Sequence, residues 1–226
     1  MPIFQLREDP IFPDPELAEE EGIIAIGGDL SPERLVAAYS CGVFPWYSEG
    51  DPILWFSPNP RMVLYPQNFK QSKTLARLKR SGKYELRIDT DFPSVIAACS
   101  KIPRPGQDGT WITRDMQEAY IQLYELGLAH SFETYFEGQL VGGLYGVSLG
   151  KAFFGESMFH HQRDASKFAF DALVDFSIEK HFYFIDAQQP TRHLTSLGGE
   201  KVSRSTFLRE LAMSQNHPTL QGSWSL

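Results

Sequence analysis

Glu156, Asp186 and Gln188 are the polar side chains whose types and spacing could do chemistry. Glu156 lies in the segment FFGESMF, and Asp186 and Gln188 lie two residues apart in the segment FIDAQ. Both segments are typical of strands, in which residues i and i+2 share one face. We therefore expect Asp186 and Gln188 on one face of their strand, and Glu156 with Met158 on one face of the other. Together they would offer two carboxylates, a carboxamide and an apolar wall.

Acyl transfer to an α-amine needs this mixture of groups. The ammonium form, with an unperturbed pKa of about 8, must lose a proton before it attacks, and the tetrahedral oxyanion needs donors. Each residue also has a structural alternative. Asp186 could cap the turn after its strand, Glu156 could pair with Arg163, and Gln188 could bond to a loop.

From residue 67 onward the sequence predicts a regular alternation of helices and strands. The expected helices cover residues 72–81, 92–99, 113–126, 165–178, 192–197 and 205–214. The expected strands cover residues 84–88, 130–136, 139–148, 151–159 and 182–187, and residues 104–109 form a loop. Glu137 and Gly138 are the expected hairpin turn between two of the strands. This order predicts an α/β (α+β) domain.

Residues 1–66 are rich in proline, glycine and aromatic residues, which excludes long helices. One short helix is expected at residues 32–40, with Ser31 as its cap. An aromatic cluster in this region either packs in a core or forms a ligand platform. Its members are Trp46, Tyr47, Trp55 and Phe56. We therefore divide the chain into a small N-terminal domain, residues 1–66, and a catalytic domain, residues 67–226.

The net charge of −7 disfavours general nucleic-acid binding, but the charge is unevenly distributed. The helix expected at residues 72–81 would carry Lys73, Arg77 and Arg80 on one face. Such a stripe is either a solvated face or a contact surface for phosphates. The sequence alone leaves both alternatives open.

The sequence shows no membrane span, signal peptide or cluster of metal ligands, which bears on where the protein is found and whether it binds metal. No apolar run approaches the roughly 20 residues that cross a bilayer, and the N-terminus does not resemble a signal peptide. A cytoplasmic protein without membrane association is expected. Cys41 and Cys99 fit free thiols better than a disulfide. His160 and His161 are adjacent and have no evident third ligand, so no metal site is expected.

The central hairpin followed by strand, helix and strand resembles the order of elements in the GCN5-related acetyltransferase fold. In that fold the pyrophosphate of coenzyme A lies on a glycine-rich loop between a strand and the following helix. The corresponding residues here, 160–166, contain no glycine, and Asp164 would repel a phosphate. Coenzyme A is therefore disfavoured as the acyl donor.

Six sequence blocks occur in order between about Gly22 and Leu208. They are Gly27–Pro32, Gly42–Trp46, Trp55–Pro58, Gly109–Thr113, Gly155–Phe159 and Ile185–Gln188. Taken together, these blocks resemble the bacterial leucyl/phenylalanyl-tRNA–protein transferase family. The resemblance implies transfer of Leu or Phe, and less readily Met, from aminoacyl-tRNA to proteins that begin with Arg or Lys. The modified protein is thereby marked for degradation, and the reaction needs no metal, ATP or coenzyme A.

The resemblance also implies roles for the candidate residues at the centre of the site. Asp186 and Gln188 would deprotonate or orient the attacking amine, and Glu156 would bind the incoming cationic N-terminus. Trp46 and Trp111 would lie near the 3′-terminal adenosine and the aminoacyl group, where an aromatic face can stack on a base.

Further residues would bind the rest of the aminoacyl-tRNA. Met158, with Leu144 beside it, would line the pocket for the Leu or Phe side chain. Lys73, Arg77 and Arg80 would contact the tRNA backbone. The resemblance thus favours a phosphate-contact surface over a solvated face for the basic stripe.

Two other functions stay open at this point. One is a coenzyme A-dependent N-acetyltransferase of the same fold, and the other is a non-catalytic RNA-binding module. The sequence does not decide between Leu and Phe, nor does it give the protein substrates or the proton-transfer path. It also leaves the oligomeric state open, with a monomer as the expectation.

Overall fold

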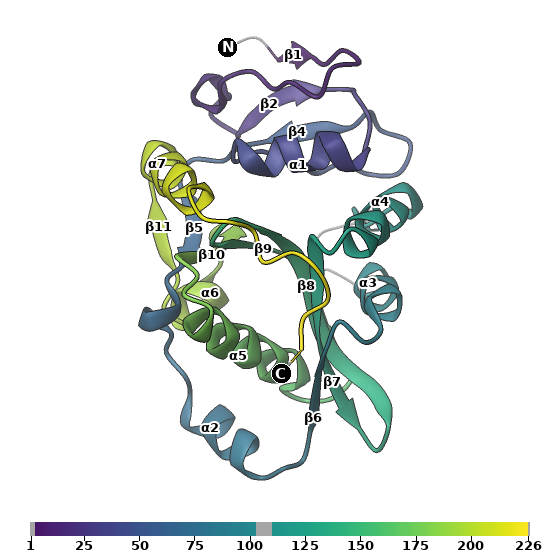
Figure 1. Cartoon of the computed structure of the whole chain (residues 1–226), viewed down its shortest axis with the longest axis vertical. Coiled ribbons are helices and arrows are strands. Elements are labelled where there is room, and N and C mark those ends of the chain that lie inside the picture. The colour runs from purple at the N-terminus through teal and green to yellow at the C-terminus, as the bar shows by residue number, and fades with distance from the viewer. Residues whose placement is uncertain (1–2, 103–109, 226) are drawn as a thin grey trace.

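The first part of the chain forms a four-stranded sheet with one helix beside it (Figure 1). The structure, a computed structural model, describes residues 3–102 and 110–225. In spatial order the strands are β1 (Phe4–Gln5), β2 (Ile23–Ile26), β4 (Leu54–Phe56) and β3 (Phe44–Pro45). Helix α1 (Pro32–Ser40) begins after Ser31, whose side chain accepts the Arg34 N–H. The helix expected at residues 32–40 is confirmed.

The rest of the chain is built on a seven-stranded sheet. In spatial order its strands are β11 (Glu200–Val202), β5 (Arg61–Leu64), β10 (Phe184–Gln188), β9 (Ala152–His160), β8 (Gln139–Leu149), β7 (Ala129–Phe136) and β6 (Glu85–Ile88). Strands β9 and β10 are parallel, and the other neighbouring pairs are antiparallel. Glu137 and Gly138 turn between β7 and β8 with positive φ angles, as a tight hairpin requires.

Helices cover both faces of the larger sheet. They are α2 (Lys73–Arg80), α3 (Phe92–Ser100), α4 (Arg114–Glu125), α5 (Ala165–Glu179), α6 (Arg192–Ser196) and α7 (Arg204–Gln215). Alternate residues of β8 enter two different cores: Tyr145 and Val147 pack with α3 and α4, whereas Leu144 packs with α5. Figure 1 shows α5 on one side of the sheet and α3 and α4 on the other.

The expected mixed α/β class is confirmed, and the helices lie within two residues of their expected bounds. Strand β11 was not predicted, because its three residues carry no alternating pattern and depend on pairing with β5. Strand β5 belongs to the larger sheet although it precedes residue 67, and the division after residue 66 stays a prediction. The loop expected at residues 104–109 lies outside the described residues. Among the described helices, none is long and apolar enough to cross a bilayer.

Strands β9 and β10 separate after a short paired region, and this separation makes room for a site. They pair only from Ala152 to Phe154 on β9 and from Phe184 to Asp186 on β10. Beyond that point β9 continues along β8, whereas β10 ends at Gln188.

Candidate active site

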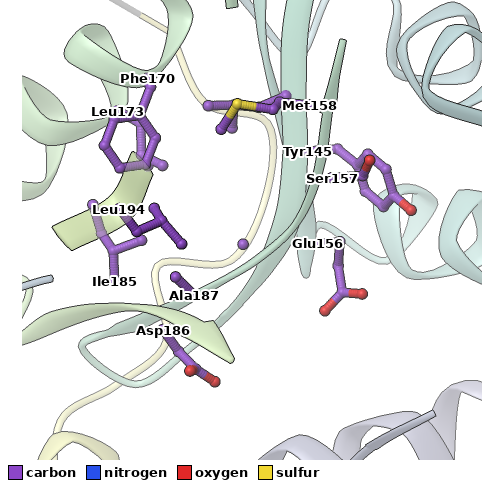
Figure 2. A pocket seen from close by; sticks show the side chains of 12 residues that line it. Tyr145, Glu156, Ser157, Met158, Phe170, Leu173, Ile185, Asp186, Ala187 and Leu194 are labelled. Atoms are coloured by element: carbon purple, nitrogen blue, oxygen red, sulfur yellow. The ribbon is translucent and has the colours of Figure 1, made fainter. Parts of the chain in front are cut away.

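Two adjoining cavities, of about 160 and 190 Å³, open where β9 and β10 separate. The first, seen in Figure 2, has a wall that is mostly apolar. This wall is formed by Leu144, Met158, Phe170, Leu173, Ile185 and Leu194. The second is lined mainly by aromatic and polar residues, among them Phe44, Trp46, Trp111, Gln188, Gln189 and Thr191. Glu156 and Leu194 line both cavities, so the two share a wall.

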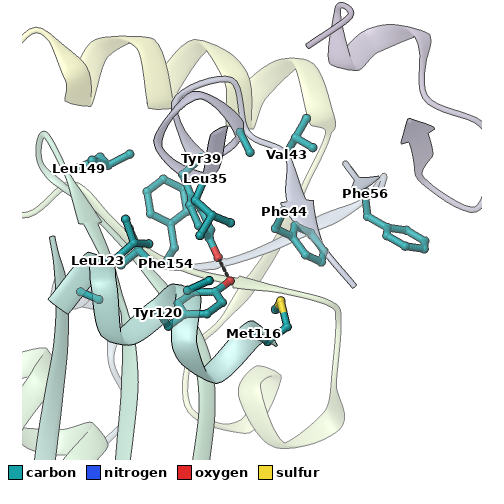
Figure 3. Packing of buried hydrophobic residues seen from close by; sticks show 14 of the residues in the cluster. Leu35, Tyr39, Val43, Phe44, Phe56, Met116, Tyr120, Leu123, Leu149 and Phe154 are labelled. Carbon is teal, nitrogen blue, oxygen red and sulfur yellow. Dashed lines mark hydrogen bonds between the residues drawn. The ribbon is translucent and has the colours of Figure 1, made fainter. Parts of the chain in front are cut away.

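The Glu156 carboxylate lies at the junction of the cavities and is buried among hydrogen-bond donors. The Tyr39 hydroxyl donates to its Oε1 at 2.7 Å, and the Tyr120 hydroxyl donates to its Oε2 at 3.1 Å. The Gln188 Nε2 donates to Oε1 at 2.8 Å. The hydroxyls of Tyr39, on α1, and Tyr120, on α4, also lie within hydrogen-bond distance of each other (Figure 3). Because each hydroxyl has one proton, a hydrogen bond between them forms only when one of them is not donating to Glu156. Three distant parts of the chain therefore meet at one carboxylate.

Burial sets the protonation behaviour of this group. It raises the pKa of Glu156 from 4.5 to about 7, a rise that the three donors oppose and the charge of Asp186 supports. Burial, followed by the charge of Glu156, raises the pKa of Tyr39 and of Tyr120 well above 10, so both stay donors at neutral pH. A carboxyl group with a pKa near neutrality can take up and release a proton at physiological pH.

Asp186 is held differently, in a fully buried ion pair. Arg61 donates from Nε to Oδ1 at 2.9 Å and from Nη2 to Oδ2 at 2.6 Å. The backbone N–H of Gln188 also donates to Oδ1, at 2.9 Å. Because both oxygens of Asp186 are engaged, its carboxylate is arranged to hold neighbours in place.

We expected regular alternation to put Asp186 and Gln188 on one face of β10, but the strand is irregular between them. Asp186 lies opposite Val63 and Gln188 lies opposite Met62, so Ala187 is an extra residue in the ladder. Gln188 adopts a left-handed conformation, with φ of 58°. This bulge turns the end of β10 so that the Gln188 side chain reaches Glu156.

The prediction that Glu156 and Met158 share a face of β9 is wrong. Ser157 lies opposite Tyr145 and Gly155 lies opposite Gly146, so Glu156 is itself the extra residue of a second bulge. The bulge interrupts the alternation. Met158 therefore packs with the core beneath α5, and Glu156 points to the tyrosines of α1 and α4.

The remaining candidates fall into two groups. Leu144 and Met158 line the first cavity, and Trp46 and Trp111 line the second, so each of the four lines a cavity that Glu156 also lines. The structural alternative for Glu156 is not realised, because Arg163 is highly exposed and its Nε lies 3.4 Å from an oxygen of Asp164.

The basic stripe lies apart from both cavities. Lys73, Arg77 and Arg80 are exposed on α2, at the end of the molecule opposite the small sheet (Figure 1). Lys79, on another side of the same helix, bonds to Asp171 of α5 at 2.9 Å. The stripe is thus free to contact a large ligand, and its role stays a prediction.

Sequence reasoning missed Tyr39, Tyr120 and Arg61. The tyrosines read as ordinary apolar-face residues of their helices, since nothing local indicates their shared partner. Arg61 carried a signal, because it opens the apolar strand Arg61–Leu64. A charged residue in such a strand indicates a buried partner.

Comparison with known proteins identifies the family of this chain. Residues 63–212 match the sequence model of the leucyl/phenylalanyl-tRNA protein transferase family, and residues 28–59 match that of its N-terminal domain. A curated leucyl/phenylalanyl-tRNA–protein transferase of Desulfatibacillum aliphaticivorans is 51% identical over 226 residues, which cover 100% of this chain and 97% of the relative. One of Myxococcus xanthus is 52% identical over 227 residues, with the same coverage.

The solved structure of L-PGS from Bacillus licheniformis is only weakly similar, with a TM-score of 0.40 at 10% identity over 72% of this chain and 50% of its own. The sequence matches extend over nearly the whole chain, including both halves of the site. The chain therefore belongs to the leucyl/phenylalanyl-tRNA–protein transferase family.

Proposed function

We propose that this protein transfers Leu or Phe, and less readily Met, from aminoacyl-tRNA to the α-amine of proteins whose N-terminal residue is Arg or Lys. The observation that carries the proposal is the junction of an apolar and an aromatic cavity at Glu156 and Gln188. An aminoacyl ester has the matching parts, which are an apolar side chain, an adenosine and a reactive carbonyl between them.

The two cavities suit the two ends of the donor. In the first, Leu144 and Met158 would contact the Leu or Phe side chain, and the flexible thioether can adapt to both shapes. In the second, Trp46 and Trp111 would stack on the terminal adenosine, a contact of about 1–3 kcal/mol per base. The ester carbonyl would then lie near Glu156 and Gln188.

Glu156 is the proposed acceptor of the first proton from the incoming ammonium group. Transfer from an amine of pKa about 8 to a carboxylate of pKa about 7 costs only about 1.4 kcal/mol. An exposed glutamate, with a pKa near 4.3, would make the same step cost about 5 kcal/mol. The carboxylate also attracts the cationic N-terminus before the proton moves.

Gln188 and Asp186 are proposed to orient the amine. Because the Nε2 of Gln188 donates to Glu156, its Oε1 is the carboxamide atom suited to accept an N–H of the amine. Asp186 holds the backbone of Gln188, and both of its oxygens already accept hydrogen bonds. The amine nitrogen bonds to the ester carbon, the C–O bond to the ribose breaks, and the second amine proton passes to the ribose oxygen.

Features outside the two cavities support further parts of the proposal. Lys73, Arg77 and Arg80 would contact the tRNA backbone without reading sequence. The order of elements from β7 to β10 supports a GCN5-related acetyltransferase-like domain, residues 67–226, after a small N-terminal domain, residues 1–66. A substrate of charged tRNA supports a cytoplasmic location, and we expect a monomer.

The proposal is tested with labelled Leu-tRNA and Phe-tRNA and a peptide that begins with Arg. Incorporation of label is expected, and the same peptide with an acetylated N-terminus is the matched control. Failure to incorporate label, with a competent transferase run in parallel, would refute the proposal. Calorimetric titration with acetyl-coenzyme A tests the competing N-acetyltransferase, which micromolar binding would support.

A further inference from the structure

Arg61 is a fully buried guanidinium at the boundary between the two sheets. Besides its two bonds to Asp186, its Nη1 donates to the carbonyl oxygen of Gly42 at 3.0 Å. Its charged carbon lies 4.9 Å from the centre of the Phe44 ring and 4.3 Å from that of Phe207. The side chain is therefore fixed on every side, by a carboxylate, a carbonyl and two aromatic faces.

Stability alone is a weak reason for this arrangement. Removing two charges from water costs several kcal/mol per ion, and apolar replacement of a buried pair is often neutral or stabilising. An Arg–carboxylate pair with two hydrogen bonds fixes the orientation of the carboxylate, because the planar guanidinium holds both of its oxygens. A lysine keeps the positive charge but cannot make the same pair of parallel hydrogen bonds to both carboxylate oxygens.

The orientation of the Asp186 carboxylate fixes the position of Gln188, which in turn contacts Glu156. The same Oδ1 that receives Arg61 Nε also accepts the backbone N–H of Gln188. Gln188 adopts φ of 58°, a left-handed conformation that is unfavourable for a residue other than glycine. Its Nε2 reaches Glu156 from that conformation. A shift of Asp186 would release this turn and move the carboxamide.

Charge is the second effect of the pair. Asp186 acts on Glu156 as a neighbouring negative charge. Arg61 balances that charge at a distance of 2.6 Å. Without the guanidinium, a second uncompensated carboxylate would favour the neutral form of Glu156.

We propose that Arg61 is a positioning residue for aminoacyl transfer, which holds Asp186 so that Gln188 meets Glu156 and which balances the charge of Asp186 next to that centre. The proposal rests on the proposed function of Glu156 and Gln188. It assigns Arg61 no contact with either substrate.

The decisive variant is Arg61→Lys, compared with wild type and with Arg34→Lys. Arg34 is a matched control, because it is also fully buried but bonds to Asp29 and to the backbone oxygens of Arg7, Glu8 and Asp9, away from both cavities. We expect Arg61→Lys to lower kcat about 10- to 100-fold, with KM for both substrates within about twofold, because small misplacements have effects of that size. Arg34→Lys should keep the wild-type kcat.

A pH profile separates positioning from simple stabilisation. Arg61→Gln leaves Asp186 unbalanced, so the acidic limb of kcat/KM should move by about one pH unit towards alkaline pH. The double variant Arg61→Gln with Asp186→Asn should restore the limb while kcat stays low. If Arg61→Gln does not fold, the double variant and Arg61→Lys still test the proposal.

Two results would overturn the role of Arg61. One is a wild-type kcat in Arg61→Lys at a temperature at which the variant is folded, and the other is an unmoved acidic limb in Arg61→Gln. Wild-type turnover is the reference in each comparison. Its absence would refute the proposed function instead, so the two failures are distinguishable.

Discussion

Glu156→Gln should change how the stability of the protein depends on pH. The folded pKa of Glu156, about 7, lies above its ordinary value of 4.5. The group therefore contributes stability that is fully present below about pH 4.5 and is lost as pH rises through about 7. The full loss is about 3 kcal/mol, because each pKa unit corresponds to about 1.4 kcal/mol. Glutamine has a similar shape and cannot ionise, so the variant escapes this loss.

Urea denaturation between about pH 5 and pH 9 measures the effect as a difference between two proteins. The free energy of unfolding of the variant, minus that of wild type, should rise by about 2–3 kcal/mol over this range. For a chain of this size that corresponds to roughly 5–10 °C in Tm. Glu118→Gln, at an exposed site paired with Arg114, controls for the loss of one carboxylate. Parallel stability curves for wild type and Glu156→Gln would refute the reasoning about a desolvated carboxyl group.

Other parts of the site can be tested through the donor. Trp111→Ala should raise KM for aminoacyl-tRNA about 5- to 100-fold, because stacking on the terminal adenine is lost. An unchanged KM would refute the binding of this base in the second cavity. Met158→Ala enlarges the first cavity, so the ratio of kcat/KM for Phe-tRNA over Leu-tRNA should rise, by up to about 10-fold; a fixed ratio would exclude Met158 from side-chain recognition. Changing Lys73, Arg77 and Arg80 together to Ala should weaken tRNA binding and reduce its logarithmic salt slope by about 2–3. If filter binding gives the same salt slope for wild type and the triple variant, the stripe is a solvated face and not a tRNA contact.

The sequence predicted the elements whose causes are local. The helix at residues 32–40 is an example, because Ser31 caps it, Pro32 begins it and Gly42 follows it with φ of 80°. An added Cβ at Gly42 would also lie 2.7 Å from the Leu208 side chain, so the close approach of α7 depends on this glycine.

The parts that could not be predicted depend on distant partners or on irregular strands. Alternation assumed regular strands for Asp186 and Gln188 on β10 and for Glu156 and Met158 on β9. Each strand has a bulge there, and a bulge of one residue leaves no mark in the sequence pattern. Arg61 and Asp186 are 125 residues apart, and their pairing exists only once β5 lies beside β10. Such contacts are products of topology, not of spacing.

Single-turnover transfer from pre-bound Leu-tRNA to a peptide that begins with Arg tests the central claim most directly. Binding of Leu-tRNA is measured on the same samples, for wild type and for Gln188→Ala. We predict that wild type forms the Leu-extended peptide, and that Gln188→Ala binds Leu-tRNA about equally well but transfers Leu about 100-fold more slowly or worse. An equal transfer rate in the two proteins, or no transfer by wild type, would contradict the account.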